Sequence, residues 1–307
     1  MQLYFAVPDT ATTHDGVLVR SFLRQCAVST DLARAVKFRG GGFFADGVPV
    51  LANRRIYPEQ MLSFALPPEG DGVTPQPEIP VKVVYEDAFA VVLEKPPQLA
   101  VHPTLNYPGG TLANGYAAWA AAHGHSPVFR PVNRIDKDTS GLLVVAKDDA
   151  THIGLSQQMA VHSVERAYQT VVYGGFAQDE GFVEANLGRS KTDRKKMAVY
   201  PASEPHTKYA YTGYKVLERL GEVTLLECRL KTGRTHQIRV HMASIHHPVA
   251  GDPVYGPHNC ITSLHGQCLH AKTLGFVHPI TGEQLRFDSE LPDYFTHFLA
   301  TLRRKNT

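Results

Sequence analysis

The stretch Pro131-Val-Asn-Arg-Ile-Asp-Lys-Asp-Thr-Ser-Gly-Leu-Leu-Val-Val-Ala-Lys147 decides how the rest of the chain is interpreted. Its first half is polar and turn-forming, whereas Gly141 to Ala146 is an apolar run of the length typical of a buried strand. Asp136 therefore lies in a loop that leads directly into a rigid element, where functional sites are commonly built. The stretch predicts a central strand with an acidic side chain at its entrance.

Two simpler interpretations of Asp136 have to be compared with a functional one. Asp136, Asp138, Ser140 and Gly141 match the first half of a calcium-binding loop, but the twelfth position of that loop is Lys147 instead of glutamate. An aspartate in such a turn also bonds readily to its own backbone and needs no further role. This stretch alone excludes the calcium loop and leaves the structural turn open.

Working outward, the segment that follows Val81 mixes short strands and helices without regular alternation. A hairpin is predicted from Val81–Val84 and Ala90–Leu93, a strand around Val223–Leu230, and a closing helix around Tyr294–Leu302. This pattern favours an α+β fold with a mixed, largely antiparallel central sheet over a doubly wound one. Residues 67–80 hold five prolines and two glycines, so we expect a linker there between a small unit, 1–66, and a larger domain, 81–307.

The N-terminal unit has the pattern of a small α/β module. Leu18, Phe22 and Cys26 are spaced as on one helix face, Ser29 or Thr30 can cap a second helix, and Asp46-Gly47 is typical of a hairpin turn. The layout is similar to the small RNA-binding module of a small-subunit ribosomal protein and of tyrosyl-tRNA synthetases. That similarity makes Arg24 and Lys37 candidate RNA contacts, and the alternative is a plain helical hairpin with solvated arginines.

A second informative segment is Arg229-Leu-Lys-Thr-Gly-Arg-Thr-His-Gln-Ile-Arg-Val-His-Met-Ala243. It predicts a strand end, a glycine turn and a helix that we expect Thr235 to cap. Arg234, His236 and Arg239 crowd the turn and the first helical turns. A further run, Arg189–Lys196, carries five basic residues and one acid, so Arg194, Lys195 and Lys196 are candidate phosphate contacts. The alternative for that run is an ordinary solvated charge cluster.

Taken together, the motifs resemble those of the RluA-type pseudouridine synthases over most of residues 81–292. The matching pieces follow the family's order: Glu94–Pro97 with Val101–Pro103, Asn133–Lys147, Ala167-Tyr168, Arg234–His241, Gly251–Gly256 and His270–Phe276. The resemblance implies a central mixed sheet with an active-site cleft, and it implies that the enzyme isomerises uridine to pseudouridine in a folded RNA with no cofactor and no metal. Ribosomal RNA is favoured over transfer RNA because the N-terminal unit is present.

The resemblance also implies roles for individual residues. Asp136 is the expected catalytic carboxylate, and Arg239 is expected to pair with it. Tyr168 is expected to pack against the flipped base and assist proton removal, and Arg134 to enter the RNA stack that the base leaves. Further contacts to RNA are expected from Asn133, Arg234 and His236. Asn133 stands where the family often has histidine, which puts the detailed RNA contacts in doubt more than the chemistry.

Composition restricts the competing functions. The formal net charge is only +2, so any RNA contact must come from local basic surfaces. No two of the four cysteines form a C-x-x-C pair, no apolar run approaches the ~20 residues of a membrane helix, and the first ten residues lack a signal-peptide layout. We therefore expect a cytoplasmic enzyme with no membrane contact. The alternatives are a non-catalytic RNA-binding or ribosome-assembly factor and an aspartate-nucleophile hydrolase.

Overall fold

The computed structural model describes residues 2–9, 16–66, 72–104, 108–193, 196–257, 264 and 266–305. The N-terminal part contains β1 Gln2–Ala6, β2 Val17–Leu18, α1 Val19–Gln25, α2 Thr30–Arg39, β3 Phe43–Ala45, β4 Val48–Val50, β5 Arg55–Ile56 and β6 Met61–Ala65. The strands of the larger part are β7 Lys82–Glu86, β8 Ala90–Lys95, β9 Arg130–Pro131, β10 Ser140–Ala146, β11 Glu165–Tyr173, β12 Glu180–Arg189, β13 Met197–Tyr200, β14 Lys208–Leu220, β15 Val223–Leu230, β16 Leu269–Val277 and β17 Gln284–Asp288. Its helices are α3 Leu112–Ala122, α4 Asp149–Ala160, α5 Gln237–Ser244 and α6 Asp293–Lys305.

The N-terminal part forms its own small sheet and core. Its strands pair in the order β1-β6-β3-β4, and α1 and α2 bury Phe22, Leu23 and Val36 against them. The Ser29 hydroxyl accepts a hydrogen bond from the Leu32 backbone N–H at 3.0 Å and caps α2, as the sequence predicts. The Asp46-Gly47 turn joins β3 to β4 with positive φ at both residues, which is the backbone of the predicted two-residue hairpin.

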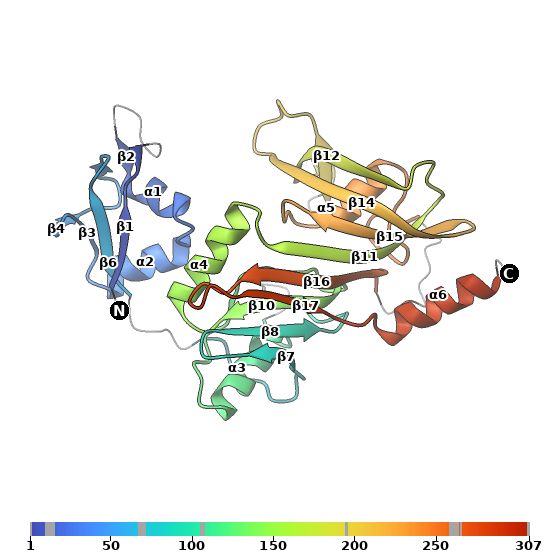
Figure 1. The fold of residues 1–307 in the computed structure, drawn as a ribbon, viewed down its shortest axis with the longest axis horizontal. Helices are drawn as coiled ribbons and strands as arrows, with labels where there is room; N and C mark the ends of the chain where they lie inside the picture. The colour runs from blue at the N-terminus through green and yellow to red at the C-terminus, as the bar shows by residue number, and fades with distance from the viewer. Residues whose placement is uncertain are drawn as a thin grey trace.

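One long sheet organises the larger part (Figure 1). The strand order is β13-β12-β14-β15-β11-β16-β10-β8-β7, with β17 paired to β16 and β9 paired to β10. Within the described residues, β10–β16 is the one parallel pair between neighbouring strands. This arrangement confirms the predicted α+β fold with a mixed, largely antiparallel sheet.

Helices cover both faces of this sheet. α3 and α5 contribute Leu112, Tyr116, Ile238 and Met242 to the largest hydrophobic cluster, which also holds Tyr168. On the other face, α4 and α6 pack Leu155 and Phe295 into two further clusters. In Figure 1, α4 lies between the long sheet and the N-terminal part, and α6 lies at the opposite end.

The N-terminal part touches the larger one through α4. Ile153 of α4 belongs to the N-terminal core, and the Gln157 side-chain amide donates to the Cys26 carbonyl at 3.2 Å. Of the predicted linker 67–80, residues 67–71 lie outside the described part of the chain. Its remainder packs on α3, because the Asn114 amide donates to the Thr74 carbonyl at 2.9 Å. The domain boundaries therefore stay a prediction.

The start of β10 explains one glycine of the deciding stretch. Gly141 has φ +112 and pairs with Ala271 of β16, and a Cβ at this position would collide with the Ala271 carbonyl. Only glycine accommodates both the backbone conformation and the close approach. β10 therefore begins at a fixed place, four residues after Asp136, and this fixes where the acidic loop leaves the sheet.

Candidate active site

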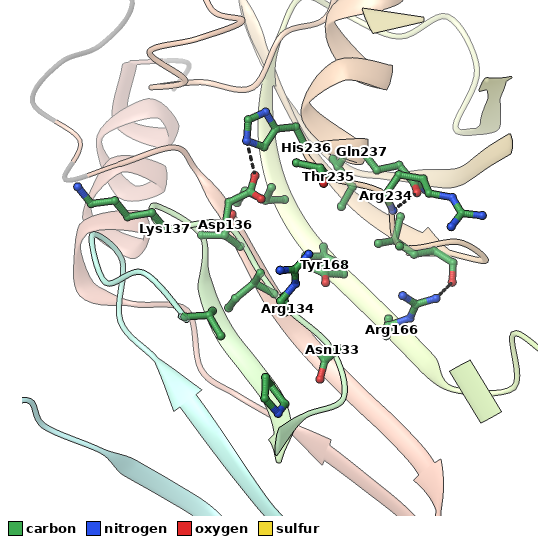
Figure 2. Close-up of a pocket in the computed structure, with 18 of the residues that line it drawn as sticks. Asn133, Arg134, Asp136, Lys137, Arg166, Tyr168, Arg234, Thr235, His236 and Gln237 are labelled. Carbon is green, nitrogen blue, oxygen red and sulfur yellow. Dashed lines mark hydrogen bonds and ion pairs between the residues drawn. The ribbon is translucent and has the colours of Figure 1, made fainter. Parts of the chain in front are cut away.

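A cleft of about 450 Å³ opens over the loop that precedes β10. Most of its lining comes from the loop 100–104, the stretch 131–139, the start of β11 and the segment 230–239 that leads into α5, with Met159 and Leu269 added from α4 and β16. The polar and aromatic side chains that line the cleft include Asn133, Arg134, Asp136, Arg166, Tyr168, Arg234, His236 and Arg239. Figure 2 shows most of them pointing toward the same space.

Asp136 is held by a buried arginine. Arg239 Nη1 donates to Asp136 Oδ2 at 2.9 Å, although the two residues are 103 positions apart in the chain. The Asp136 side chain is 25% exposed, so one carboxylate edge faces the cleft while the other is paired. The geometry is that of an accessible carboxylate beside a permanent positive charge.

Arg239 is itself fixed from behind by Asp252. Its Nε and Nη2 donate to the two Asp252 carboxylate oxygens at 2.7 and 2.8 Å, a bidentate pair in which the Asp252 side chain is fully buried. Burial alone would lower the pKa of Arg239, but Asp252 and Asp136 raise it above its ordinary value. Asp252 Oδ1 also accepts hydrogen bonds from the backbone N–H groups of Val254 and Tyr255. The guanidinium is thereby locked in one orientation toward Asp136.

His236 lies on the open side of Asp136, with its Nε2 4.0 Å from Asp136 Oδ2. Its Nδ1 is 2.9 Å from the Tyr255 hydroxyl, which in turn accepts from the Met197 N–H at 2.8 Å. If the hydroxyl proton goes to Nδ1, the Tyr255 hydroxyl donates one hydrogen bond and accepts one, and Nε2 carries its proton on the side that faces Asp136. Burial lowers the pKa of His236 and Asp136 opposes this shift, so the ring is neutral at pH 7.

The helix entrance differs from the sequence prediction. His236, with a left-handed φ of 56°, is the residue that precedes α5, and no side chain caps the helix there. Thr235 is therefore not the cap. The turn is instead held by the buried Gln237 amide, whose oxygen accepts from the Thr232 hydroxyl and the Arg234 N–H.

Tyr168 lies on β11 where the register with β16 shifts between Ala167 and Tyr168. Such irregularities commonly aim a side chain into a site. Tyr168 is 7% exposed and lines the cleft. Burial raises its pKa, against the opposing charge of Arg166, so it remains a neutral phenol at pH 7. It therefore offers an aromatic face and a hydroxyl more readily than a phenolate base.

The remaining predicted RNA contacts occupy different places. Arg134 is exposed and points into the cleft, and Arg234 also lines it (Figure 2). Asn133 is buried at the cleft wall, where its side-chain oxygen accepts from the Val144 N–H at 2.9 Å. Arg24 and Lys37 are exposed on α1 and α2 and do not line the cleft, nor does Lys196 just before β13. Arg194 and Lys195 lie outside the described residues.

Three buried side chains brace the loop that holds Asp136 from behind, and the sequence predicted no role for them in the site. Lys95, fully buried at the end of β8, donates to the Pro96 and Lys137 carbonyls at 2.7 and 2.8 Å. The Gln267 amide donates to the Thr139 hydroxyl at 2.7 Å, and His270 Nδ1 bonds to the Ser140 hydroxyl at 2.8 Å. The loop is thus tied to three different strands or segments.

Lys95 gives a testable pH dependence. Burial lowers the pKa of its ammonium group from the ordinary 10.5 to about 7. Between these values the unfolded chain binds more protons than the folded one, so this group makes stability rise with pH. We expect the unfolding free energy of wild type, relative to that of Lys95→Met, to rise by up to about 1.4 kcal/mol per pH unit from pH 7 to 9.5. Urea unfolding across that range measures it, and two parallel stability curves would contradict the assignment.

The described residues hold no group of three or more His, Cys, Asp or Glu side chains arranged to bind a metal ion. Likewise, no helix in that part of the chain is long and apolar enough to cross a membrane.

Comparisons with known proteins point to one family. The model of the RNA pseudouridylate synthase family matches residues 90–244. The uncharacterized RNA pseudouridine synthase YlyB of Bacillus subtilis is 43% identical over 270 residues, 87% of each chain. The ribosomal large subunit pseudouridine synthase D of Zymomonas mobilis is 46% identical over 226 residues, 70% of each chain. Among solved structures, human RNA pseudouridylate synthase domain containing 4 matches with a TM-score of 0.60 and 25% identity, over 72% of this chain and 93% of that one.

Proposed function

This chain belongs to the RNA pseudouridylate synthase family and isomerises uridine to pseudouridine in RNA, and we propose that it does so in large-subunit ribosomal RNA through Asp136. The observation that supports Asp136 is its geometry: one accessible carboxylate, held by the buried Arg239 at the bottom of a cleft that Tyr168 lines. The proposal for the RNA rests on relatives, such as those of Zymomonas mobilis and Pseudomonas aeruginosa, that are named for the ribosomal large subunit.

The reaction breaks the bond between N1 of uracil and C1′ of the sugar, turns the base, and joins C5 to C1′. The Asp136 carboxylate acts covalently, at the sugar C1′ or at C6 of the base. Both routes use a carboxylate oxygen of Asp136 as the attacking atom. Arg239 donates to that carboxylate and fixes its orientation, and Asp252 keeps Arg239 in place. N1 gains a proton after its bond to C1′ breaks, and C5 loses its proton after the new bond forms. The covalent bond to Asp136 breaks again before the product leaves, so the number of atoms in the RNA is unchanged.

The target base has to leave its stack before it reaches Asp136, at a cost of a few kcal/mol. Arg134, exposed at the cleft and long enough to enter the RNA, takes the vacated place in this proposal. Tyr168 packs against the extruded uracil, where a neutral aromatic ring stacks without a charge penalty. His236 presents its Nε2 beside the same carboxylate, in reach of a sugar hydroxyl or phosphate of the bound nucleotide.

In the same proposal, the N-terminal part binds RNA. Its separate sheet supports α1 and α2, which expose Arg24 and Lys37 to solvent. The basic run that holds Arg194, Lys195 and Lys196 supplies a second set of phosphate contacts in this proposal. The cytoplasm, where ribosomal RNA is modified in bacteria, is the expected compartment.

Mapping pseudouridine in total RNA from cells with and without this gene tests the substrate. We expect one or a few positions of large-subunit ribosomal RNA to lose pseudouridine, and the wild-type gene to restore them. Loss of pseudouridine in transfer RNA alone would replace the ribosomal substrate with the transfer RNA alternative. An unchanged map in both RNA classes, with RNA binding retained, would favour the non-catalytic RNA-binding factor.

A further inference from the structure

One arginine in the cleft has no role in the chemistry described above. Arg166 precedes Tyr168 by two residues on β11, so the two side chains leave the strand on the same face, about 7 Å apart along the backbone. Arg166 is 6% exposed and lines the cleft. In Figure 2, Tyr168 lies between Asp136 and Arg166, which places this guanidinium at the other end of the site from the carboxylate.

The Arg166 charge is not neutralised by any acid in the described part of the chain. Its Nη2 donates only to the backbone carbonyls of Leu230 and Lys231, at 3.5 and 3.2 Å. Its Nε is buried and has no hydrogen-bond partner among the described residues. The adjacent Glu165 does not compensate for it, because that carboxylate pairs with Arg286 on the surface. A buried charge without a counter-ion is costly, and such groups normally serve a ligand or a partner.

A second positive charge faces the same end of the cleft. Burial lowers the pKa of Arg166 and the nearby charge of Arg234 lowers it further, but an arginine stays protonated in proteins. Gly233 immediately precedes Arg234, and a Cβ there would lie 2.7 Å from Arg166 Nη1. Because residue 233 has no side chain, the outer edge of the Arg166 guanidinium stays open to the cleft.

We propose that Arg166 and Arg234 form an anion site that takes a backbone phosphodiester of the RNA next to the target uridine. The inference rests on the proposed function, since RNA is what brings a phosphodiester into this cleft. The Nη1 group of Arg166, on the edge that Gly233 leaves open, can donate a charge-assisted hydrogen bond to a phosphate oxygen. With the base on Tyr168 and the sugar near Asp136, a phosphate at Arg166 would fix the nucleotide at a third point. Arg166 is then a binding residue that orients the substrate.

Single-phosphate replacement in the RNA tests this site directly. The probe is a stem-loop of large-subunit ribosomal RNA that contains the modified uridine, with each phosphate around it replaced in turn by an uncharged methylphosphonate. Wild type should bind one of these RNAs about tenfold more weakly, the scale of one charge-assisted hydrogen bond. Arg166→Gln should bind the normal stem-loop about tenfold more weakly and lose the sensitivity to that one replacement. Its slope of log affinity against log salt should fall by about one.

The controls separate this site from a structural role and from the proposed function. Arg303→Gln removes an exposed arginine that pairs with Glu218 outside the cleft, and should leave affinity and salt slope unchanged. If Arg166→Gln does not fold, Arg166→Lys should keep the salt slope and show a weaker response at the same phosphate only. An Arg166 variant that folds and keeps the wild-type slope and phosphate response overturns the anion site. If wild type binds the stem-loop but forms no pseudouridine, the enzymatic proposal is refuted. The slopes of log affinity against log salt then still decide whether Arg166 binds a phosphate.

Discussion

Replacing Asp136 with asparagine is expected to abolish pseudouridine formation while RNA affinity stays within a few fold of wild type. Asparagine has nearly the same volume and still accepts a hydrogen bond from Arg239, so the loop and the cleft should persist. The variant lacks the charged oxygen that attacks the nucleotide, and loss of such a group acts on the scale of about 10⁴-fold or more in kcat. Pseudouridine formation on the substrate stem-loop, followed in a single turnover, and binding of the same RNA give the two measurements.

The matched control is the neighbouring carboxylate in the same loop. Asp138 does not line the cleft, so Asp138→Asn should keep activity within a few fold. The same assay distinguishes an isomerase from an aspartate hydrolase, because an isomerase leaves the RNA mass unchanged and releases no uracil. Full activity of Asp136→Asn would remove this residue from its role, and released uracil with wild type would favour the hydrolase.

The sequence predicts those features of the site that depend on residues close together in the chain. The step from polar residues to the apolar run Gly141–Ala146 marks β10, and the acidic loop before it, without any tertiary information. The caps and turns of the N-terminal part are local as well, since Ser29 acts on Leu32 and Asp46-Gly47 closes its own hairpin. These features are determined within a few residues, and the structure has them where the pattern predicts.

The supporting residues could not be predicted in the same way. Lys95 reaches the carbonyl of Lys137 from 42 positions away, and Gln267 reaches Thr139 from 128 positions away. In the sequence, Lys95 and Asp252 lie in motif pieces that match the family, but nothing in those pieces says which atoms the two side chains contact. Their roles appear only when the sheet brings β8, β10 and the segment before β16 together. The cap assigned to Thr235 failed for the same reason, because Gln237 holds that turn through its contacts with Thr232 and β14.

Removing the carboxylate of Asp252 should damage both stability and catalysis. Arg239 is 4% exposed, and two of the three hydrogen bonds that it donates to carboxylates go to Asp252. Removing Asp252 breaks the buried ion pair and leaves the guanidinium with the partly exposed Asp136, and breaking a buried pair costs about 3–5 kcal/mol. We therefore expect Asp252→Ala to lower the free energy of unfolding by that amount, as measured by urea denaturation at pH 7.

The same substitution should reduce kcat by about 100-fold, the effect of a small misplacement of a catalytic group. Without Asp252, the Arg239 guanidinium is free to rotate, and the Asp136 carboxylate loses the fixed geometry that faces the nucleotide. Glu218→Gln provides the comparison, because it breaks an exposed pair with Arg303 and should cost no more than about 1 kcal/mol. Asp252→Asn keeps the oxygen that the Val254 and Tyr255 N–H groups use, so it should retain more stability than alanine and regain little activity. If Asp252→Ala matched Glu218→Gln in stability and kept wild-type kcat, Arg239 would be oriented by something other than this buried pair.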